Sequence, residues 1–211
     1  MRRTRPTPRT AAVLLALLLA ATLLPGVLAR SASASAAQRS EVRRYAVISF
    51  HKNYRNTLRS ELVWTVYRVR DGHTTTLVEK HWRAGSGANR HATNSCRTNV
   101  GWLPNGWYRP RLYTDYPGNL IKGRAILLGR KACGDGTTRT DLFIHTEQGP
   151  RSVQCPDDVG DQACRWEYPR INDYRSLGCI KLAPADMREL YDAWTRFFRT
   201  GYTDRVRVRV G

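Results

Sequence analysis

The sequence predicts a mainly β domain that carries one substantial helix near its C-terminus and ends in a strand. Short segments rich in β-branched and aromatic residues follow one another from residue 45 onward and are separated by Gly, Pro and Asn turns. This composition is typical of strands. Residues 184–198 instead repeat apolar side chains every three or four positions, as a helix does. The last residues alternate strictly between arginine and valine, which indicates a half-buried strand.

The predicted strands follow in chain order. They are expected at residues 45–50, 61–69, 74–82, 123–129 and 140–145. Residues 61–82 form a hairpin in this interpretation, because Asp71-Gly72-His73 is a turn between two strand-like segments. Residues 85–95 are a polar loop, 102–114 contain a Pro-Asn-Gly turn between aromatic residues, and 133–139 are a turn.

The helix and the final strand complete the predicted domain. Pro184 occupies a first helical position, where proline is tolerated, and Gly201 fits a C-terminal cap. The apolar face of the helix is predicted to consist of Met187, Leu190, Tyr191, Trp194 and Phe198. In the final strand the valines at 206, 208 and 210 are expected to face inward.

The N-terminus has the order of a secretory signal peptide. Four arginines precede an apolar run from Ala11 to Ala29, and an Ala/Ser-rich stretch follows. An uncleaved membrane anchor is the alternative, since the run is near spanning length, but Pro25 and the small residues favour cleavage. We therefore expect a signal peptide at 1–37, one domain at 38–211, and Sec-dependent secretion to the bacterial cell wall.

The chain is strongly basic, with a formal net charge of +18 at pH 7. A basic exported protein is expected to associate with anionic wall polymers. The alternative is that the charge only keeps the protein soluble. Export, and the lack of a basic-aromatic recognition motif, argue against nucleic acid as a partner.

Five cysteines in an oxidising compartment leave at least one thiol outside any intramolecular pairing. Cys155 and Cys164 bracket a short loop, so they pair easily. Cys96 and Cys133 both lie in loop sequence and could form a second bridge. That pairing leaves Cys179 as the free thiol, although the sequence alone leaves other pairings open.

A cysteine nucleophile needs a neighbouring base, because a free thiol has a pKa of about 8.5. The chain has five histidines, at 51, 73, 81, 91 and 145. His145 differs from the others because it ends an apolar strand where the chain enters a Gly/Pro loop. Such strand ends often present reactive groups, although a histidine that merely ends a strand is the alternative.

The segments "FIHTE" (143–147) and "SLGCIKL" (176–182) together resemble the catalytic signature of the L,D-transpeptidase (YkuD-type) family. That signature is an apolar pair and His, a spacer, and then Ser-x-Gly-Cys-apolar-basic. "WLPNGWY" (102–108) is similar to a further family segment. The resemblance extends over about residues 45–210, and it implies a β-sandwich or barrel.

The resemblance also implies a mechanism and its residues. Cys179 would attack the third residue of a peptidoglycan stem tetrapeptide and release D-alanine, with His145 as general base and then acid. Ser176 would orient His145 or the loop, and the backbone at Gly178 would contribute to the oxyanion hole. Lys181 and Leu177 are expected to contact substrate. The acyl group would pass to a neighbouring stem amine or to water, in a monomer without cofactor or metal.

Two features depart from the family pattern. Leu177 stands where most members have a histidine, and 34 positions separate His145 from Cys179, which is more than usual. We interpret the excess, at about 146–172, as a disulfide-linked insertion beside the active site. It is acidic, and one hypothesis is that it offers negative charge to the incoming amine; a solvated acidic loop is the alternative.

Two other functions remain alternatives. Sortase-like transpeptidases also place His before Cys, but they use a different cysteine strand and a later catalytic arginine. A non-catalytic, basic wall-binding protein with a buried Cys179 is the other alternative. Papain-like peptidases place Cys before His, and no histidine follows Cys179.

Overall fold

The computed structural model describes residues 42–156, 160 and 162–211. All of them belong to one of the two units into which the chain divides, Arg39–Gly211. The predicted signal peptide lies outside the described residues. Within the described chain, no helix combines the length and the apolar character needed to span a membrane.

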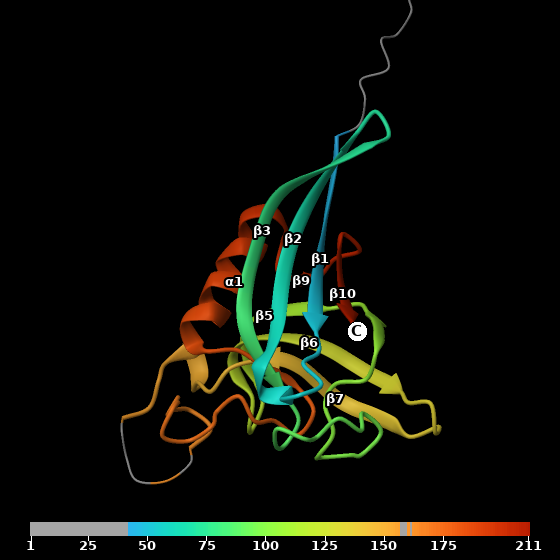
Figure 1. Ribbon diagram of the computed structural model, residues 1–211. Coiled ribbons are helices and arrows are strands. Elements are labelled where there is room, and N and C mark those ends of the chain that lie inside the picture. Colours follow the sequence, from blue (N-terminus) through green and yellow to red (C-terminus); the bar gives the residue numbers. More distant parts are fainter. Residues whose placement is uncertain (1–41, 157–159, 161) are drawn as a thin grey trace, which may run out of the picture. The chain divides into compact units, whose positions relative to one another are not determined.

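The described residues are mainly β, as predicted, with one α-helix near the C-terminus and a final strand (Figure 1). The strands are β1 Arg43–His51, β2 Ser60–Arg70, β3 His73–Ser86, β4 Gly106–Tyr108, β5 Arg111–Pro117, β6 Lys122–Ala132, β7 Thr138–His145, β8 Ile180–Lys181, β9 Gly201–Tyr202 and β10 Val206–Val210. The helix is α1 Pro184–Phe197, and short 3-10 turns lie at η1 Thr57–Arg59 and η2 Pro150–Ser152.

The strands described here form one open ten-stranded sheet in the order β4-β10-β1-β2-β3-β8-β7-β6-β5-β9. The long strand β3 pairs with β2 through most of its length and with β8 at Gly85 and Ser86. It therefore belongs to both halves of the sheet, which cross steeply in Figure 1. The predicted sandwich or barrel is thus a single bent sheet that does not close.

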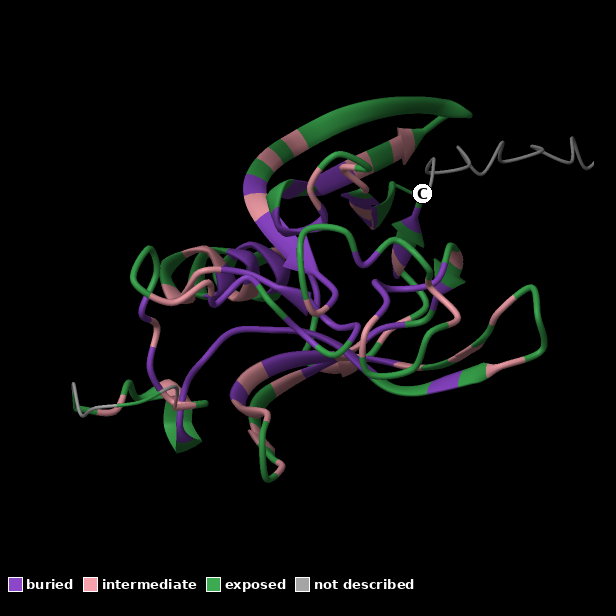
Figure 2. Cartoon of the chain, turned by 60° about the horizontal axis from the view of Figure 1, so that its bottom comes forward, coloured by how far each residue is buried: buried purple, intermediate pink, exposed green. Residues whose placement is uncertain are grey.

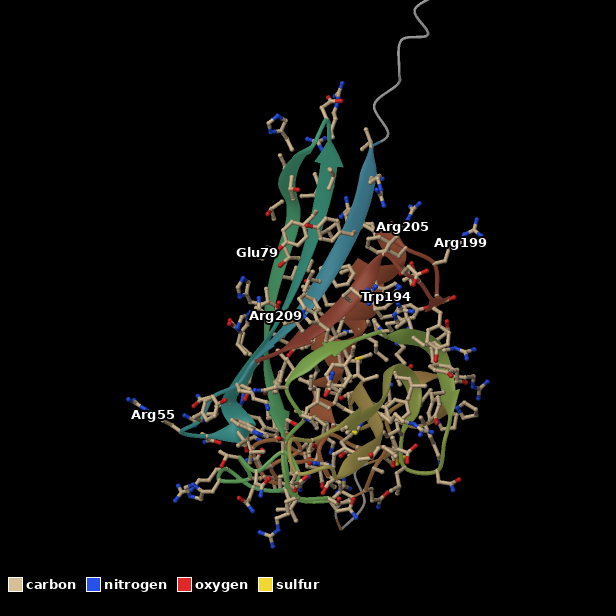
Figure 3. The ribbon with its side chains drawn as sticks, turned by 90° about the vertical axis from the view of Figure 1, so that its right-hand side faces the viewer. Arg55, Glu79, Trp194, Arg199, Arg205 and Arg209 are labelled. Carbon is tan, nitrogen blue, oxygen red and sulfur yellow. A yellow bond between two sulfur atoms is a disulfide. The ribbon has the colours of Figure 1, made fainter. Side chains whose placement is uncertain are left out.

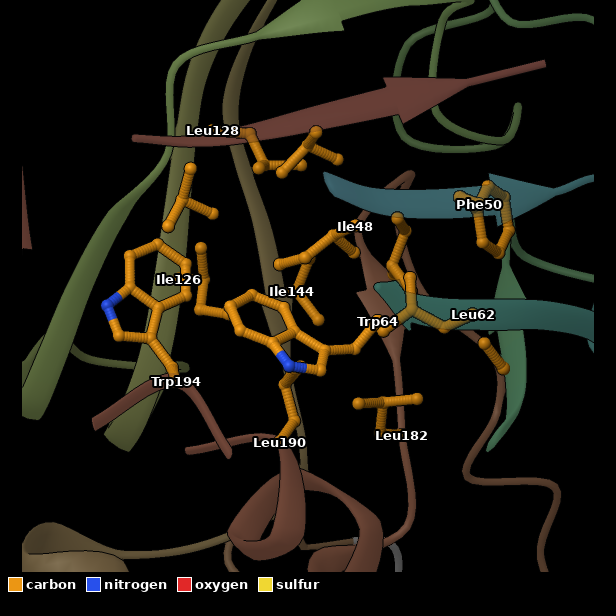
Figure 4. Packing of buried hydrophobic residues seen from close by; sticks show 14 of the residues in the cluster. Ile48, Phe50, Leu62, Trp64, Ile126, Leu128, Ile144, Leu182, Leu190 and Trp194 are labelled. Atoms are coloured by element: carbon orange, nitrogen blue, oxygen red, sulfur yellow. The ribbon is translucent and has the colours of Figure 1, made fainter. Parts of the chain in front are cut away.

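One hydrophobic core lies between the two halves of the sheet and α1 (Figure 4). Trp64 of β2 stacks on Trp194 of α1 with ring centroids 5.9 Å apart. Ile48 of β1 and Ile126 of β6 belong to the same cluster and are fully buried. Residues from both halves of the sheet therefore pack together, and they bury the apolar surface that stabilises the fold.

The hairpin of β2 and β3 and the strand β10 agree with the sequence prediction. Asp71 and Gly72 both have positive φ, 52° and 77°, which is the geometry of the two-residue turn that Asp-Gly favours. The three valines of β10 are buried and pair in parallel with β1. The outer part of the hairpin, by contrast, is exposed on β3 and alternates between exposed and half-buried residues on β2 (Figure 2).

The predicted cap at Gly201 is wrong. The helix α1 ends at Phe197, and Phe198 caps it in an extended conformation by donating its N–H to the Trp194 carbonyl. Gly201 lies further along the chain, in β9, where it pairs with Leu112 of β5. The cap was misplaced because an aromatic residue packed on Trp64 ends the helix, and no glycine is needed.

Candidate active site

The two predicted catalytic residues lie at the parallel strands β7 and β8: His145 ends β7, and Cys179 directly precedes β8. Ile144 pairs with Ile180 and His145 with Lys181. Because side chains alternate along a strand, Ile144 and Ile180 face the core while His145 and Lys181 share the other face. Cys179 precedes β8 by one residue and packs with Phe143 on this same side. Cys179 thus lies beside Phe143, two positions before His145 along β7, and not directly opposite His145.

Cys179 is a buried thiol, with 8% of its surface exposed. Its Sγ donates to the Asp141 carbonyl at 3.5 Å, and the Phe143 amide donates to the sulfur. Burial raises the pKa of Cys179 to about 11, although the Phe143 amide, Lys181 and Arg139 act in the opposite direction. The resting thiol is therefore protonated at neutral pH.

His145 is also buried, and its imidazole is neutral. Burial, together with the positive charge of Lys181, lowers its pKa to about 3, although the hydrogen bond to the Thr146 carbonyl acts in the opposite direction. Nδ1 lies 3.2 Å from the Thr146 carbonyl, so we assign the proton to Nδ1. This leaves the lone pair of Nε2 available, as a general base requires. Among the described residues, the imidazole makes no hydrogen bond to Cys179.

Ser176 holds the loop before Cys179. Its Oγ accepts from the amides of Gly87, at 3.1 Å, and Gly178, at 3.2 Å, and donates to the Cys179 carbonyl at 2.6 Å. Of its two predicted roles, the structure thus favours orientation of the loop over orientation of His145. The Gly178 amide already donates to Ser176 Oγ, which argues against its predicted role as an oxyanion donor. The Cys179 amide is the remaining candidate for that role.

Arg139 was missed from the sequence, and it clamps this loop. It is 3% exposed, and its Nη2 donates to the Leu177 carbonyl at 2.9 Å while Nη1 donates to the Ser95 carbonyl at 2.6 Å. Gly178 has a φ of +119°, and a Cβ there would lie 2.0 Å from Arg139 Nη2. Only glycine fits this position. Arg139 fell in the segment predicted as a turn, 133–139, and no pattern in the sequence indicated that its side chain is buried.

The two predicted substrate contacts have different environments. Lys181 is buried and forms an ion pair with Glu147, so it is neither surface charge nor available to a substrate carboxylate. Leu177 is 58% exposed beside the nucleophile. Its position is therefore compatible with substrate contact, whereas the prediction for Lys181 is corrected.

The predicted insertion is constrained by a disulfide within it and by contacts with β3 near its end. Cys155 and Cys164 form the predicted disulfide. Near the end of the insertion, the Arg83 guanidinium of β3 lies over the rings of Tyr168, at 4.7 Å, and Tyr174, at 4.0 Å. Arg83 also donates to the Tyr168 hydroxyl at 2.8 Å. The end of the insertion is thus anchored to β3.

The acidic residues of the insertion do not form an exposed charged lid where they are described. Glu147, Glu167 and Asp173 are all buried. Glu147 pairs with Lys181, Glu167 pairs with Arg165, and Asp173 accepts from the Glu167 amide. Three further acids of the hypothesis, at 157, 158 and 161, lie outside the described residues.

The predicted second disulfide is not present. Cys96 and Cys133 are both free thiols, although the two loops bring their sulfur atoms within 4.8 Å of each other. The sequence correctly placed both in loops that can approach, but the sulfur atoms are not bonded.

The surface hollows lie away from this site. One is lined by residues of β2 and β3 and the turn before them, including Arg59, Glu61 and His81. A smaller one involves Arg109 and Tyr202. Neither is lined by His145 or Cys179, whereas Leu177, two residues before Cys179, is exposed.

No family model matches the sequence, and no curated protein is similar enough to match it. A solved structure that resembles part of the chain is that of Bdellovibrio bacteriovorus Bd1075, with 14% sequence identity and a TM-score of 0.43. The similarity covers 79% of this chain and 48% of that one, so this chain spans about half of its length. At this TM-score the similarity carries no argument about function.

Proposed function

We propose that the protein is an exported cysteine acyltransferase of the L,D-transpeptidase type that acts on peptidoglycan stem peptides. The observation that carries the proposal is that His145 ends β7 while Cys179 directly precedes the parallel strand β8 and packs on Phe143, which shares the face of β7 on which His145 lies. The motif resemblance supplies the reaction and the substrate.

The chemistry follows from these two side chains. Cys179 Sγ attacks the carbonyl carbon of the third stem residue while its proton passes to Nε2 of His145. The peptide bond to D-alanine breaks, and the imidazolium returns the proton to the leaving amine. An amine of a second stem, or water, then attacks the thioester and restores the thiol.

The resting electrostatics determine when the proton moves. With a thiol pKa of about 11, only about one molecule in 10,000 is a thiolate at pH 7. Proton transfer therefore accompanies attack and does not precede it. Catalytic hydrogen bonds often shorten only in the substrate complex, and substrate would have to draw Sγ and Nε2 together.

The test is release of D-alanine from tetrapeptide stems, followed by mass spectrometry of the protein and its products. Wild type should release D-alanine and carry an acyl group on Cys179. Cys179→Ala should do neither, and His145→Gln should lose activity while remaining folded. Cys133→Ala is the matched cysteine control: it removes a thiol outside the strand pair, so Cys179 should still become acylated, whatever the change in rate. Wild type that neither releases D-alanine nor becomes acylated would refute the proposal.

A non-catalytic wall-binding protein is the second candidate, and a specific observation favours it. Cys179 is nearly inaccessible and protonated, while Arg55, Arg199 and Arg205 extend from the surface (Figure 3). Such a protein would bind purified wall as well after Cys179→Ala as before it, without any acylation. The sortase-like alternative gains no support, because the arginine beside the loop, Arg139, precedes the cysteine and is bound to backbone carbonyls.

A further inference from the structure

Cys96, Cys133 and Asp135 form a cluster of metal-ligating side chains outside the candidate active site. Their two sulfur atoms and a carboxylate oxygen all lie within 4.8 Å of one another. Cys96 comes from the loop between β3 and β4, and the other two come from the turn between β6 and β7. The cysteines are half-buried and Asp135 is exposed, so an ion could reach them from solvent.

Backbone hydrogen bonds fix the turn that presents two of these ligands. The Cys133 amide donates to the Thr137 carbonyl at 2.8 Å, and the Gly136 amide donates to the Cys133 carbonyl at 3.1 Å. The Thr137 amide also donates to Asp135 Oδ1 at 2.9 Å. The Cys96 amide is likewise held, by Asn94 Oδ1 at 3.0 Å. The cluster is thus largely arranged before any ion binds.

The donor set suits a soft divalent ion. Two thiolates and a carboxylate match zinc, whose bonds of about 2.3 Å to sulfur and about 2.0 to 2.2 Å to oxygen place its ligands about 3.3 to 3.8 Å apart. The three donors can reach this spacing with a movement of about 1 Å. A disulfide would instead need the sulfur atoms about 2.05 Å apart and would leave Asp135 without a role.

The surrounding charge is compatible with a bound ion. The net charge of two thiolates, a carboxylate and Zn²⁺ is −1. Two cations lie near this charge: Lys52 interacts electrostatically with Cys133, and Arg139 donates to the carbonyl of Ser95, the residue before Cys96.

We propose that Cys96, Cys133 and Asp135 bind one Zn²⁺ ion, with water as the fourth ligand. Binding releases the two thiol protons to solvent. The ion would fasten the loop containing Ser95 to the turn between β6 and β7. Because Ser95 anchors Arg139, and Arg139 holds the Leu177 carbonyl, it would also steady the loop before Cys179.

The test is titration of the full protein, exported and then purified without air, with zinc chloride alone. We expect one Zn²⁺ per chain, with two sulfur ligands at about 2.3 Å by X-ray absorption. Cys133→Ser should abolish this signature. Asp135→Asn should weaken binding at least about tenfold, since even outer-shell partners are worth about 10- to 100-fold. Cys179→Ser is the matched control and should bind Zn²⁺ as wild type does.

Three results would overturn the proposal. The first is that the reduced wild type binds no stoichiometric Zn²⁺. The second is that the Asp135→Asn variant binds Zn²⁺ as tightly as wild type does; this variant should fold, because Asp135 is exposed. The third is a Cys96–Cys133 disulfide in the exported protein, seen as a mass two hydrogens lower and resistance of both cysteines to alkylation. None of these results bears on D-alanine release, so this proposal and the proposed function can fail separately.

Discussion

Replacement of Arg139 by methionine tests whether this side chain is the clamp of the nucleophile loop. The variant keeps a long side chain beside Gly178 but removes both donors from the carbonyls of Ser95 and Leu177. It also removes one of the two cations that lower the pKa of Cys179. We therefore expect two separate effects, on stability and on the thiol.

The size of the stability effect follows from the two hydrogen bonds. Each bond to a charged donor contributes about 1.5 to 3 kcal/mol, and part of this is offset because a buried cation is no longer desolvated. The expected loss is about 2 to 4 kcal/mol. For a domain of this size that corresponds to a decrease in Tm of about 5 to 15 °C. The pKa of Cys179 should rise further above its already raised value.

The assays are thermal unfolding and the pH dependence of Cys179 alkylation. Arg139→Lys is the matched control: it keeps the charge but cannot reach both carbonyls with a planar fork. It should therefore lose stability as methionine does while keeping the alkylation profile closer to wild type. An unchanged Tm in the Arg139→Met variant would refute the clamp, and equal alkylation profiles in both variants would refute the electrostatic effect.

Three further predictions concern the same face of the sheet. Iodoacetamide should label Cys179 slowly at pH 7, with a rate that rises about tenfold per pH unit toward pH 11, because only the thiolate reacts; a plateau near pH 8.5 would contradict burial of the thiol. Because the folded pKa of His145 is lowered to about 3, the unfolded state binds the extra proton between pH 6.5 and 3. Stability should therefore fall by up to about 1.4 kcal/mol per pH unit as the pH decreases through this range; urea unfolding of His145→Gln should lack this slope. Glu147→Gln should cost about 3 to 5 kcal/mol in urea unfolding because it leaves buried Lys181 charged and without this partner. Adding Lys181→Met should recover much of that loss, and a double variant as unstable as the single one would argue against the pair.

Local patterns in the sequence were sufficient for most of the fold. The Asp71-Gly72 turn, the helix after Pro184 and the alternating valines of β10 each depend on neighbouring residues, and each was predicted. The strand β8 was not, because two residues carry no periodicity and only pairing with β3 and β7 defines it.

The candidate site was predicted less completely, for a related reason. His145 and Cys179 could be identified because each lies in a recognisable segment. The ion pair of Lys181 with Glu147 joins residues far apart in the chain and depends on the parallel pairing of β7 and β8. Arg139 was missed because an arginine in a turn-like segment is usually solvated. Here its guanidinium donates to the carbonyls of Ser95 and Leu177, and Gly178, which has no side chain, leaves space for it.

The outer half of the β2–β3 hairpin has a consequence for the dynamics of the molecule. From His73 to Leu77 all side chains are exposed, and the facing residues of β2 contribute little to the core (Figure 2). Such segments open at a small fraction of the global free energy. Amide hydrogens at the tip should therefore exchange with deuterium long before those beside Trp64, and a peptide inserted after Gly72 should leave the domain folded.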